Sequence, residues 1–248
     1  MSGCRSVVLA VGLVVLVLVP GSLWASAVGQ VVLVEGEADL TRGGKPPAMP
    51  LVPKDTVAVG DVVRTKSSGR VQIKFVDDSV LTVAPESRVA IDAYMFDGAT
   101  GDRKAALEVF RGLVHTTVPK VYPGREPDFT VKTHTAIMGV RGTRWYAKLL
   151  PEATEVYTEG SLLEVRCRKL PEKLAILKGL QFTRVGLDSI LPAVDIKPEV
   201  LDALKQQLKT GISGGAHKES GAAFGAYVSR VALQTVSQQL GSRSEEHT

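Results

Sequence analysis

Histidine and cysteine are the side chains that most often bind metal ions, and the chain has few of them. No histidine lies four residues from another, and none lies beside a cysteine, as compact metal-binding motifs require. The chain also lacks the Gly-x-Ser-x-Gly turn of many hydrolases and the glycine-rich loop that binds phosphate groups. We therefore predict no catalytic residues, no metal site and no cofactor. The histidines are His115, His134, His217 and His247.

Carboxylate pairs could still support glycoside hydrolysis, because the distance between two such acids is set in space and not in the sequence. Glu35, Glu37, Glu159 and Glu164 lie near glycines or in strand-like runs. Roles in turns or on solvated faces are the simpler interpretation of all four. The segment Asp97–Asp102 lacks the alternating acids and the closing glutamate of a calcium loop, so a turn between two strands is favoured there.

The most distinctive segment predicts a specific bend between two strands. It is formed by Gly139, Val140, Arg141, Gly142 and Thr143. The two glycines are three residues apart, and the arginine between them offers a rigid set of donors that could tie down carbonyl groups at the bend. We predict a structural role for Arg141 before any direct contact with a ligand.

Arg144 and Trp145 follow this bend and could face a protein partner. Nucleic-acid binding requires several clustered cations, usually with stacking aromatic side chains. A single cluster in a chain of formal net charge +4 does not meet that requirement, so we predict no nucleic-acid partner.

The elements that must position these residues are short strands, from Gln30 to about Val185. In Arg70–Val76, apolar residues alternate with polar ones, and Asp77-Asp78 separates this run from the next, as in a hairpin. Glycines separate apolar runs at Gly36, Gly112, Gly160 and Gly179. They predict either corners between stacked strands or four plain hairpin turns. The predicted fold is mainly β, a small β-solenoid-like stack of hairpins with a C-terminal helical tail.

The tail, 189–248, changes to a helical pattern. Pro198 is suited to the first turn of a helix and Gly211 to its end, and Leu201, Leu204 and Leu208 form one apolar stripe. Such a short helix is marginal alone, so the stripe should dock on the β stack or on a partner. Residues 211–223 resemble a flexible linker, and 224–240 could form a second helix.

The N-terminus has the parts of a secretory signal over residues 1–27. Arg5 precedes the apolar run Val7–Val19, and Ala25-Ser26-Ala27 supplies small residues for cleavage. A permanent anchor would need roughly 20 apolar residues, and Pro20-Gly21 interrupts the run. We therefore expect cleavage after Ala27, a periplasmic or secreted protein, and no stable membrane span afterwards.

Residues 28–188 resemble the FecR domain family. The resemblance is carried by Gly60–Thr65, Val71–Leu81, Pro85–Val89, Val140–Thr143, and the glycine corners Glu155–Gly160 and Leu177–Gly179. One departure is Asp78, where the family usually turns on glycine. The resemblance implies a β-solenoid-like stack that makes protein contacts and has no catalytic residues.

The best-known members of this family bind a sigma factor through a cytoplasmic part and receive a signal from an outer-membrane receptor. Six residues precede the apolar run here, so sigma-factor and iron signalling are not expected to carry over. We expect a non-enzymatic, extracytoplasmic binding or sensing module that contacts an envelope protein. The alternatives are a structural or adhesion protein that binds glycan or cell wall, and a hydrolase with an unrecognised site.

Overall fold

A computed structural model describes residues 26–119, 128–140 and 142–211. These residues form one sheet of 16 strands, one α-helix and one short 3-10 helix at Arg42–Gly44. The α-helix is α1 (Pro198–Thr210). The strands are β1 (Ala27–Glu35), β2 (Ala38–Thr41), β3 (Ala48–Pro50), β4 (Thr56–Ala58), β5 (Val62–Thr65), β6 (Arg70–Phe75), β7 (Val80–Val83), β8 (Arg88–Phe96), β9 (Arg103–Arg111), β10 (Leu113–Thr117), β11 (Phe129–Lys132), β12 (Ala136–Val140), β13 (Arg144–Leu149), β14 (Thr154–Cys167), β15 (Leu174–Val185) and β16 (Val194–Asp195).

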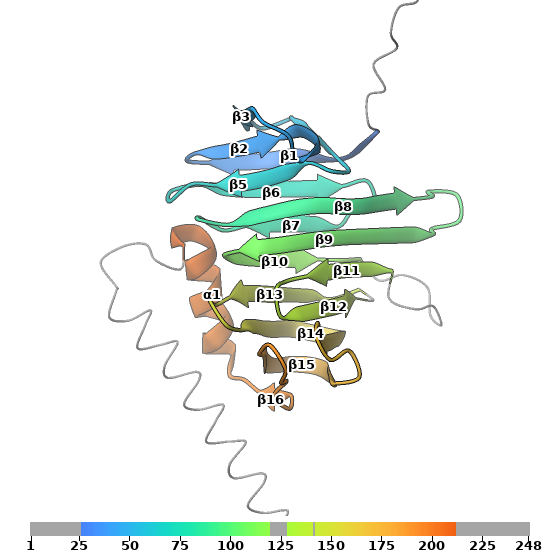
Figure 1. Cartoon of the computed structure of the whole chain (residues 1–248), viewed down its shortest axis with the longest axis vertical. Helices are drawn as coiled ribbons and strands as arrows, with labels where there is room; N and C mark the ends of the chain where they lie inside the picture. Colours follow the sequence, from blue (N-terminus) through green and yellow to red (C-terminus); the bar gives the residue numbers. More distant parts are fainter. Residues whose placement is uncertain (1–25, 120–127, 141, 212–248) are drawn as a thin grey trace, which may run out of the picture.

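The sheet curls on itself, so that two layers enclose the main core (Figure 1). We call the layer with β3, β2, β5, β8, β9, β11 and β12 the front layer, and the layer with β4, β1, β6, β7, β10 and β13 the back layer. The first half of β14 pairs with β13 and its second half with β12, so β14 belongs to both layers. In each layer the strands follow one another broadly in chain order toward β14.

The prediction of a mainly β fold with a helix near the C-terminus is confirmed. The finer prediction was a solenoid-like stack of hairpins, and the strand pairing instead describes one continuous curled sheet. Apart from the parallel pair β9–β11, neighbouring strands in the described residues are antiparallel. Hairpins are therefore present, but they are consecutive parts of the same sheet.

Alternation of side chains explains how strands of this sheet face the core. In β6, Val71, Ile73 and Phe75 are buried, whereas Gln72 and Lys74 point outward. The turn to β7 passes through Asp78 at φ 63°, a left-handed conformation that glycine adopts more cheaply. The predicted hairpin and its costlier turn are therefore both found.

The glycines that separate apolar runs are corners between the layers. Each has a positive φ, and each lies where the chain passes from one layer to the other. The first two connect β1 to β2 and β9 to β10, and the last two bend β14 and β15 in mid-strand. The four are Gly36, Gly112, Gly160 and Gly179. The corner interpretation is the correct one of the two that the sequence left open.

Helix α1 packs on the outer face of the back layer (Figure 1). It begins at Pro198 and is followed by Gly211, as predicted. Leu201, Leu204 and Leu208 are buried there in one cluster with aromatic side chains of β13, β14 and β15. A partner-binding role for these leucines is therefore wrong for the described fold, because the sheet already covers them.

Parts of the predicted organisation lie outside the described residues. These are residues 1–25 of the signal, nearly all of the linker 211–223, and the second helix at 224–240. Strand β1 starts at Ala27, the expected last residue of the signal. In the part of the chain that the structure describes, no helix is long and apolar enough to cross a membrane.

Replacing Leu204 by Ala tests the docking of α1. Leu204 is 2% exposed, so the substitution leaves a cavity between the helix and the sheet. We expect a loss of about 2 kcal/mol, at the low end of the range for buried leucines, because a helix that packs on the outer face of a sheet can shift. Leu187→Ala is the matched control, since Leu187 is 56% exposed. Equal unfolding midpoints in urea for the two variants would contradict the packing described here.

Candidate binding site

The predicted signature bend lies between β12 and β13. Gly142 has φ 88°, which gives the bend the backbone conformation that its glycine predicts. Gly139 and Val140 belong to β12 itself, where Gly139 pairs with Thr130 and with Glu164. Arg141 lies outside the described residues, so its predicted role at the bend stays a prediction.

Thr143 connects this bend to the neighbouring corner of β14. Its hydroxyl donates a hydrogen bond to the carbonyl oxygen of Gly160. The hydroxyl of Thr158 also donates to that carbonyl, at 3.0 Å, and accepts from the Gly160 N–H at 3.2 Å. Thr143 therefore connects the bend at Gly142 to the corner at Gly160 by a hydrogen bond.

Arg144 and Trp145 point to opposite sides of β13, because successive strand residues alternate. Trp145 is fully buried in the core, so its predicted contact with a partner is wrong. The Arg144 side chain is 63% exposed and lies on the outer face of the back layer. Of this pair, only Arg144 is accessible to another molecule.

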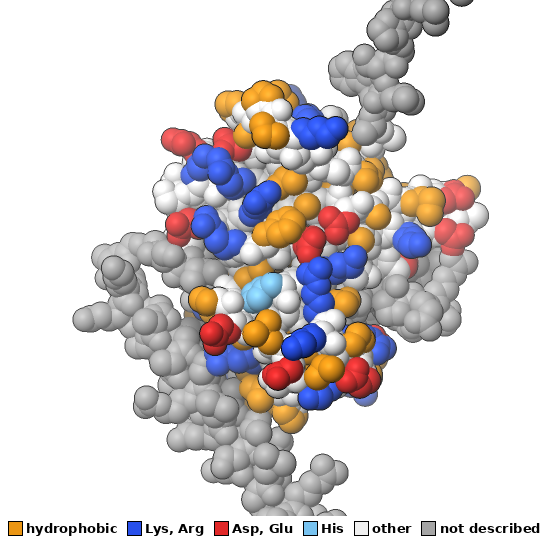
Figure 2. Space-filling model, viewed as in Figure 1, with side chains coloured by type: hydrophobic (Ala, Val, Ile, Leu, Met, Phe, Trp, Pro, Cys, Tyr) orange, Lys and Arg blue, Asp and Glu red, His pale blue; other side chains and the backbone are white. Residues whose placement is uncertain are grey.

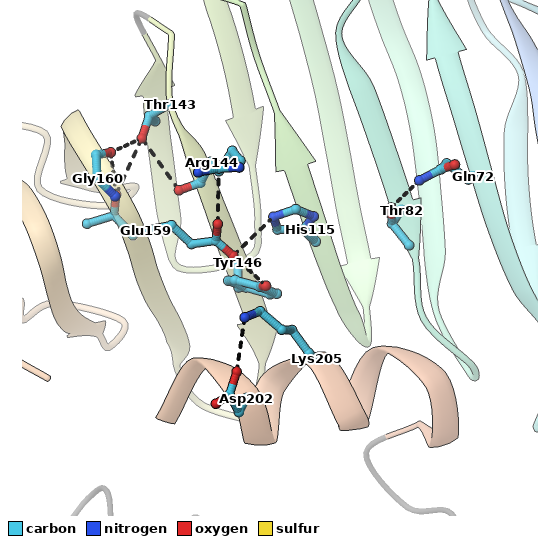
Figure 3. Close-up of polar contacts among 11 residues, drawn as sticks. Gln72, Thr82, His115, Thr143, Arg144, Tyr146, Glu159, Gly160, Asp202 and Lys205 are labelled. Carbon is cyan, nitrogen blue, oxygen red and sulfur yellow. Dashed lines mark hydrogen bonds and ion pairs between the residues drawn. The ribbon is translucent and has the colours of Figure 1, made fainter. Parts of the chain in front are cut away.

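Three side chains lie around the Glu159 carboxylate on that outer face (Figure 3). Its carboxylate accepts a hydrogen bond from the Tyr146 hydroxyl at 2.7 Å and pairs with Arg144 Nε at 3.2 Å. His115 Nε2 lies 3.7 Å from the same carboxylate, too far for a direct hydrogen bond. Strand register brings these residues together, since His115 lies opposite Tyr146. We call this group the Glu159 cluster.

Burial controls the protonation of this cluster. It lowers the pKa of His115 to about 4, with Arg144 and Lys205 acting in the same direction and Glu159 opposing them. The ring of His115 is therefore neutral near pH 7, and it packs on Tyr146 with ring centroids 4.4 Å apart. Burial, then the hydrogen bond to Glu159, raises the pKa of Tyr146 well above its ordinary value. Tyr146 thus stays a hydrogen-bond donor.

A shallow pocket of about 350 Å³ opens beside the cluster. The pocket is lined by the Gly142 bend, the Gly160 corner and the Arg144–Glu159 pair. The lining residues are Thr117, Val118, Gly142, Thr143, Arg144, Glu159, Gly160 and Ser161. Helix α1 lies next to this area, and its Lys205 pairs with Asp202 at 3.0 Å (Figure 3). The pocket can bind a small polar group through N–H donors of the Arg144 guanidinium.

Among the described residues, no three histidine, cysteine, aspartate or glutamate side chains lie together as a metal site would require.

The sequence did not predict that His115, Tyr146 and Glu159 lie close together. Residue alternation places each of them on an outward position of its strand. The pairing of β10 with β13 and of β13 with β14 places them side by side. Strands β13 and β14 are consecutive, whereas β10 and β13 are separated in the sequence by residues 118–143.

The described chain is thus a curled β-sheet domain with a shallow surface pocket beside the Glu159 cluster. Residues 61–163 match the family model described as FecR protein, so this segment is a FecR domain and the resemblance noted from the sequence is confirmed. Two crystal structures of a protein proposed to be an anti-sigma factor from Parabacteroides distasonis are similar, each at 19% identity and a TM-score of 0.47. The similarity covers 58% of this chain and 64% of theirs, which is less than two thirds of their length. A comparison with curated proteins found no match.

Proposed function

We propose that this protein is a non-enzymatic module that acts outside the cytoplasm and recognises another envelope protein through the pocket beside Glu159. The FecR domain supports a regulatory or sensing role. The observation that carries the proposal is the ion pair between Arg144 and Glu159. This ion pair positions the exposed Arg144 guanidinium beside the pocket, where Thr143 connects the Gly142 bend to the Gly160 corner.

The hydrogen bonds of the cluster favour binding over catalysis. A nucleophile needs a neighbouring base that is ready to take its proton. The Thr143 hydroxyl donates to a backbone carbonyl, and Glu159 already accepts a hydrogen bond from Tyr146 and forms an ion pair with Arg144. A preformed arrangement of this kind recognises a partner at a low entropic cost, because its side chains are ordered beforehand.

Export is the second part of the proposal, and the mature N-terminus tests it. Cleavage after Ala27 would leave Val28, which is 7% exposed in β1, as the first residue of the sheet. Mass spectrometry of the envelope fraction should therefore detect an N-terminal peptide that begins at Val28. A chain that keeps Met1, or that is found in the cytosol, would contradict this part.

Crosslinking in intact cells tests the partner. A photoreactive residue at Thr117, which lines the pocket, should capture a defined protein, and Arg144→Ala should abolish the capture. Lys74→Ala is the matched control, because Lys74 is an exposed cation of the same layer, 54% exposed and paired with Asp78. Capture that survives Arg144→Ala would exclude this pocket. Retention on purified cell wall without any protein crosslink would favour the adhesion alternative instead.

A further inference from the structure

Three arginines from three neighbouring strands lie in one row on the outer face of the front layer. The register places Arg64 of β5 opposite Arg88 of β8, and Arg88 opposite Arg111 of β9. Neighbouring strands are about 4.8 Å apart, so the three positive charges are crowded. Like charges directly opposite one another destabilise a sheet, and the row therefore works against stability.

Arg88 and Arg111 are held in place by groups that leave their charge uncompensated. The Arg88 guanidinium lies over the ring of Phe110, 5.0 Å from its centre. Arg111 Nε donates to the backbone carbonyl of Glu86 at 2.9 Å. Among the described residues, no carboxylate forms an ion pair with either arginine, so their remaining N–H donors are free to meet an anion.

Arg64, at the other end of the row, differs from these two. Asp39 binds Arg64 and Lys66 together, each at 2.7 Å. The uncompensated charge is therefore concentrated at Arg88 and Arg111, next to Phe110, which is 47% exposed. Figure 2 shows Lys and Arg side chains gathered around a hydrophobic one on this part of the front layer. We call Arg88, Arg111 and Phe110 the arginine row site.

We propose that the arginine row site binds an acidic segment of a protein partner, whose carboxylates meet Arg88 and Arg111 while an apolar side chain covers Phe110. Guanidinium groups bind carboxylates in a bidentate fashion, which fixes orientation as well as charge. The site lies on the opposite layer from the Glu159 cluster, and the proposal is independent of the function assigned to that pocket.

Other charges on the same face favour a peptide over an anionic membrane. Asp39, which pairs with Arg64 and Lys66, lies at one end of the row. Asp92 and Glu108 lie farther along β8 and β9, and Glu108 pairs with Arg168. Burial and the neighbouring charge of Glu108 raise the pKa of Asp92, so these two acids are close to each other. A continuous anionic surface would also lie against the acids of this face, Asp92 among them, whereas a peptide can place its own carboxylates against the arginines alone.

The test uses the full mature chain and a short fluorescent peptide in which several glutamates surround one phenylalanine. Fluorescence anisotropy should show binding that weakens with added salt. Arg88→Gln and Arg111→Gln should each raise the Kd about tenfold or more, because each removes a charge-assisted contact. Arg166→Gln is the matched control, since Arg166 is 38% exposed and already paired with Glu164, and its Kd should equal that of the wild type.

Three results would overturn the proposal. One is equal affinity for a peptide with glutamine in place of every glutamate. Another is unchanged binding in both Arg88→Gln and Arg111→Gln, after thermal melts have shown that at least one of them is folded. The third is binding to phosphatidylglycerol vesicles or to inorganic phosphate that depends on the same arginines while the acidic peptide does not bind.

Discussion

Replacing Gly112 by Ala is expected to cost more than about 3 kcal/mol of stability. Gly112 forms the corner between β9 and β10, at φ 98°. A Cβ atom at this position would lie 2.0 Å from Ser87 Oγ and 2.7 Å from Ser87 Cα. Ser87 is fully buried, and its hydroxyl both accepts from the Leu113 N–H at 3.1 Å and donates to the Pro85 carbonyl at 3.1 Å. The neighbouring chain therefore cannot move away without losing those hydrogen bonds.

Gly179→Ala separates the effect of the backbone conformation from that of the clash. Gly179 also forms a corner, at φ 66°, but no atom lies within 4 Å of the position that a Cβ would take. We expect a loss of about 1 kcal/mol there, from the left-handed conformation alone. Urea unfolding of both variants gives the comparison. Similar losses of stability in the two variants would mean that Ser87 can move away from residue 112 at little cost and that the Gly112 corner is not closely packed.

Replacing Asp77 by Ala is the second change with a large expected effect. Asp77 and Arg103 form an ion pair at 2.6 Å, with both side chains almost fully buried. Ser79 and Tyr94 donate further hydrogen bonds to the Asp77 carboxylate, at 2.6 Å and 2.5 Å. Removing one member of a buried pair typically costs 3–5 kcal/mol, and we expect about 3 kcal/mol because Arg103 keeps Asp128 as a partner.

Glu164→Ala is the matched control for this change. It breaks the pair with Arg166, in which both side chains are partly exposed, and should cost about 1 kcal/mol or less. Thermal and urea unfolding of the two variants should therefore differ clearly. If Asp77→Ala were no worse than Glu164→Ala, the buried network would not contribute to the fold as described.

The same network gives the stability a dependence on pH. Burial opposes ionisation of the Asp77 carboxyl, but hydrogen bonds from Ser79, Tyr94 and Arg103 outweigh it and hold the pKa below its ordinary value. A carboxyl with a lowered folded pKa stabilises the fold above its unfolded pKa, near 3.9, and loses that contribution as the pH falls further. The wild type should thus lose stability below about pH 4, and Asp77→Asn should lose less over that interval.

The strands and corners could be predicted because their signals are local. Alternating side chains identify a half-buried strand, and a glycine between two apolar runs identifies a backbone that must turn sharply. The buried positions of Val71, Ile73 and Phe75 could be predicted from the sequence for this reason. The curling of the sheet could not be predicted, because it depends on which strands pair across long stretches of chain.

The misassignment of Trp145 has a specific physical cause. Strand β13 is covered on both faces, by the core on one side and by α1 against Tyr146 on the other. A strand buried on both faces shows little alternation, so the sequence does not reveal which of two adjacent residues points outward. The Glu159 cluster was missed because the pairing of β10 with β13, which brings His115 to Tyr146, joins strands that are not consecutive in the chain.

The order of the strands has a consequence for how the sheet can assemble while the chain is being synthesised. Every strand from β3 to β16 pairs with at least one strand that precedes it in the sequence. A chain that leaves the ribosome with its N-terminus first would therefore present each new strand to a partner strand that has already been made. The sheet can grow strand by strand during synthesis, and exposed edges need not wait for the C-terminal end to be completed.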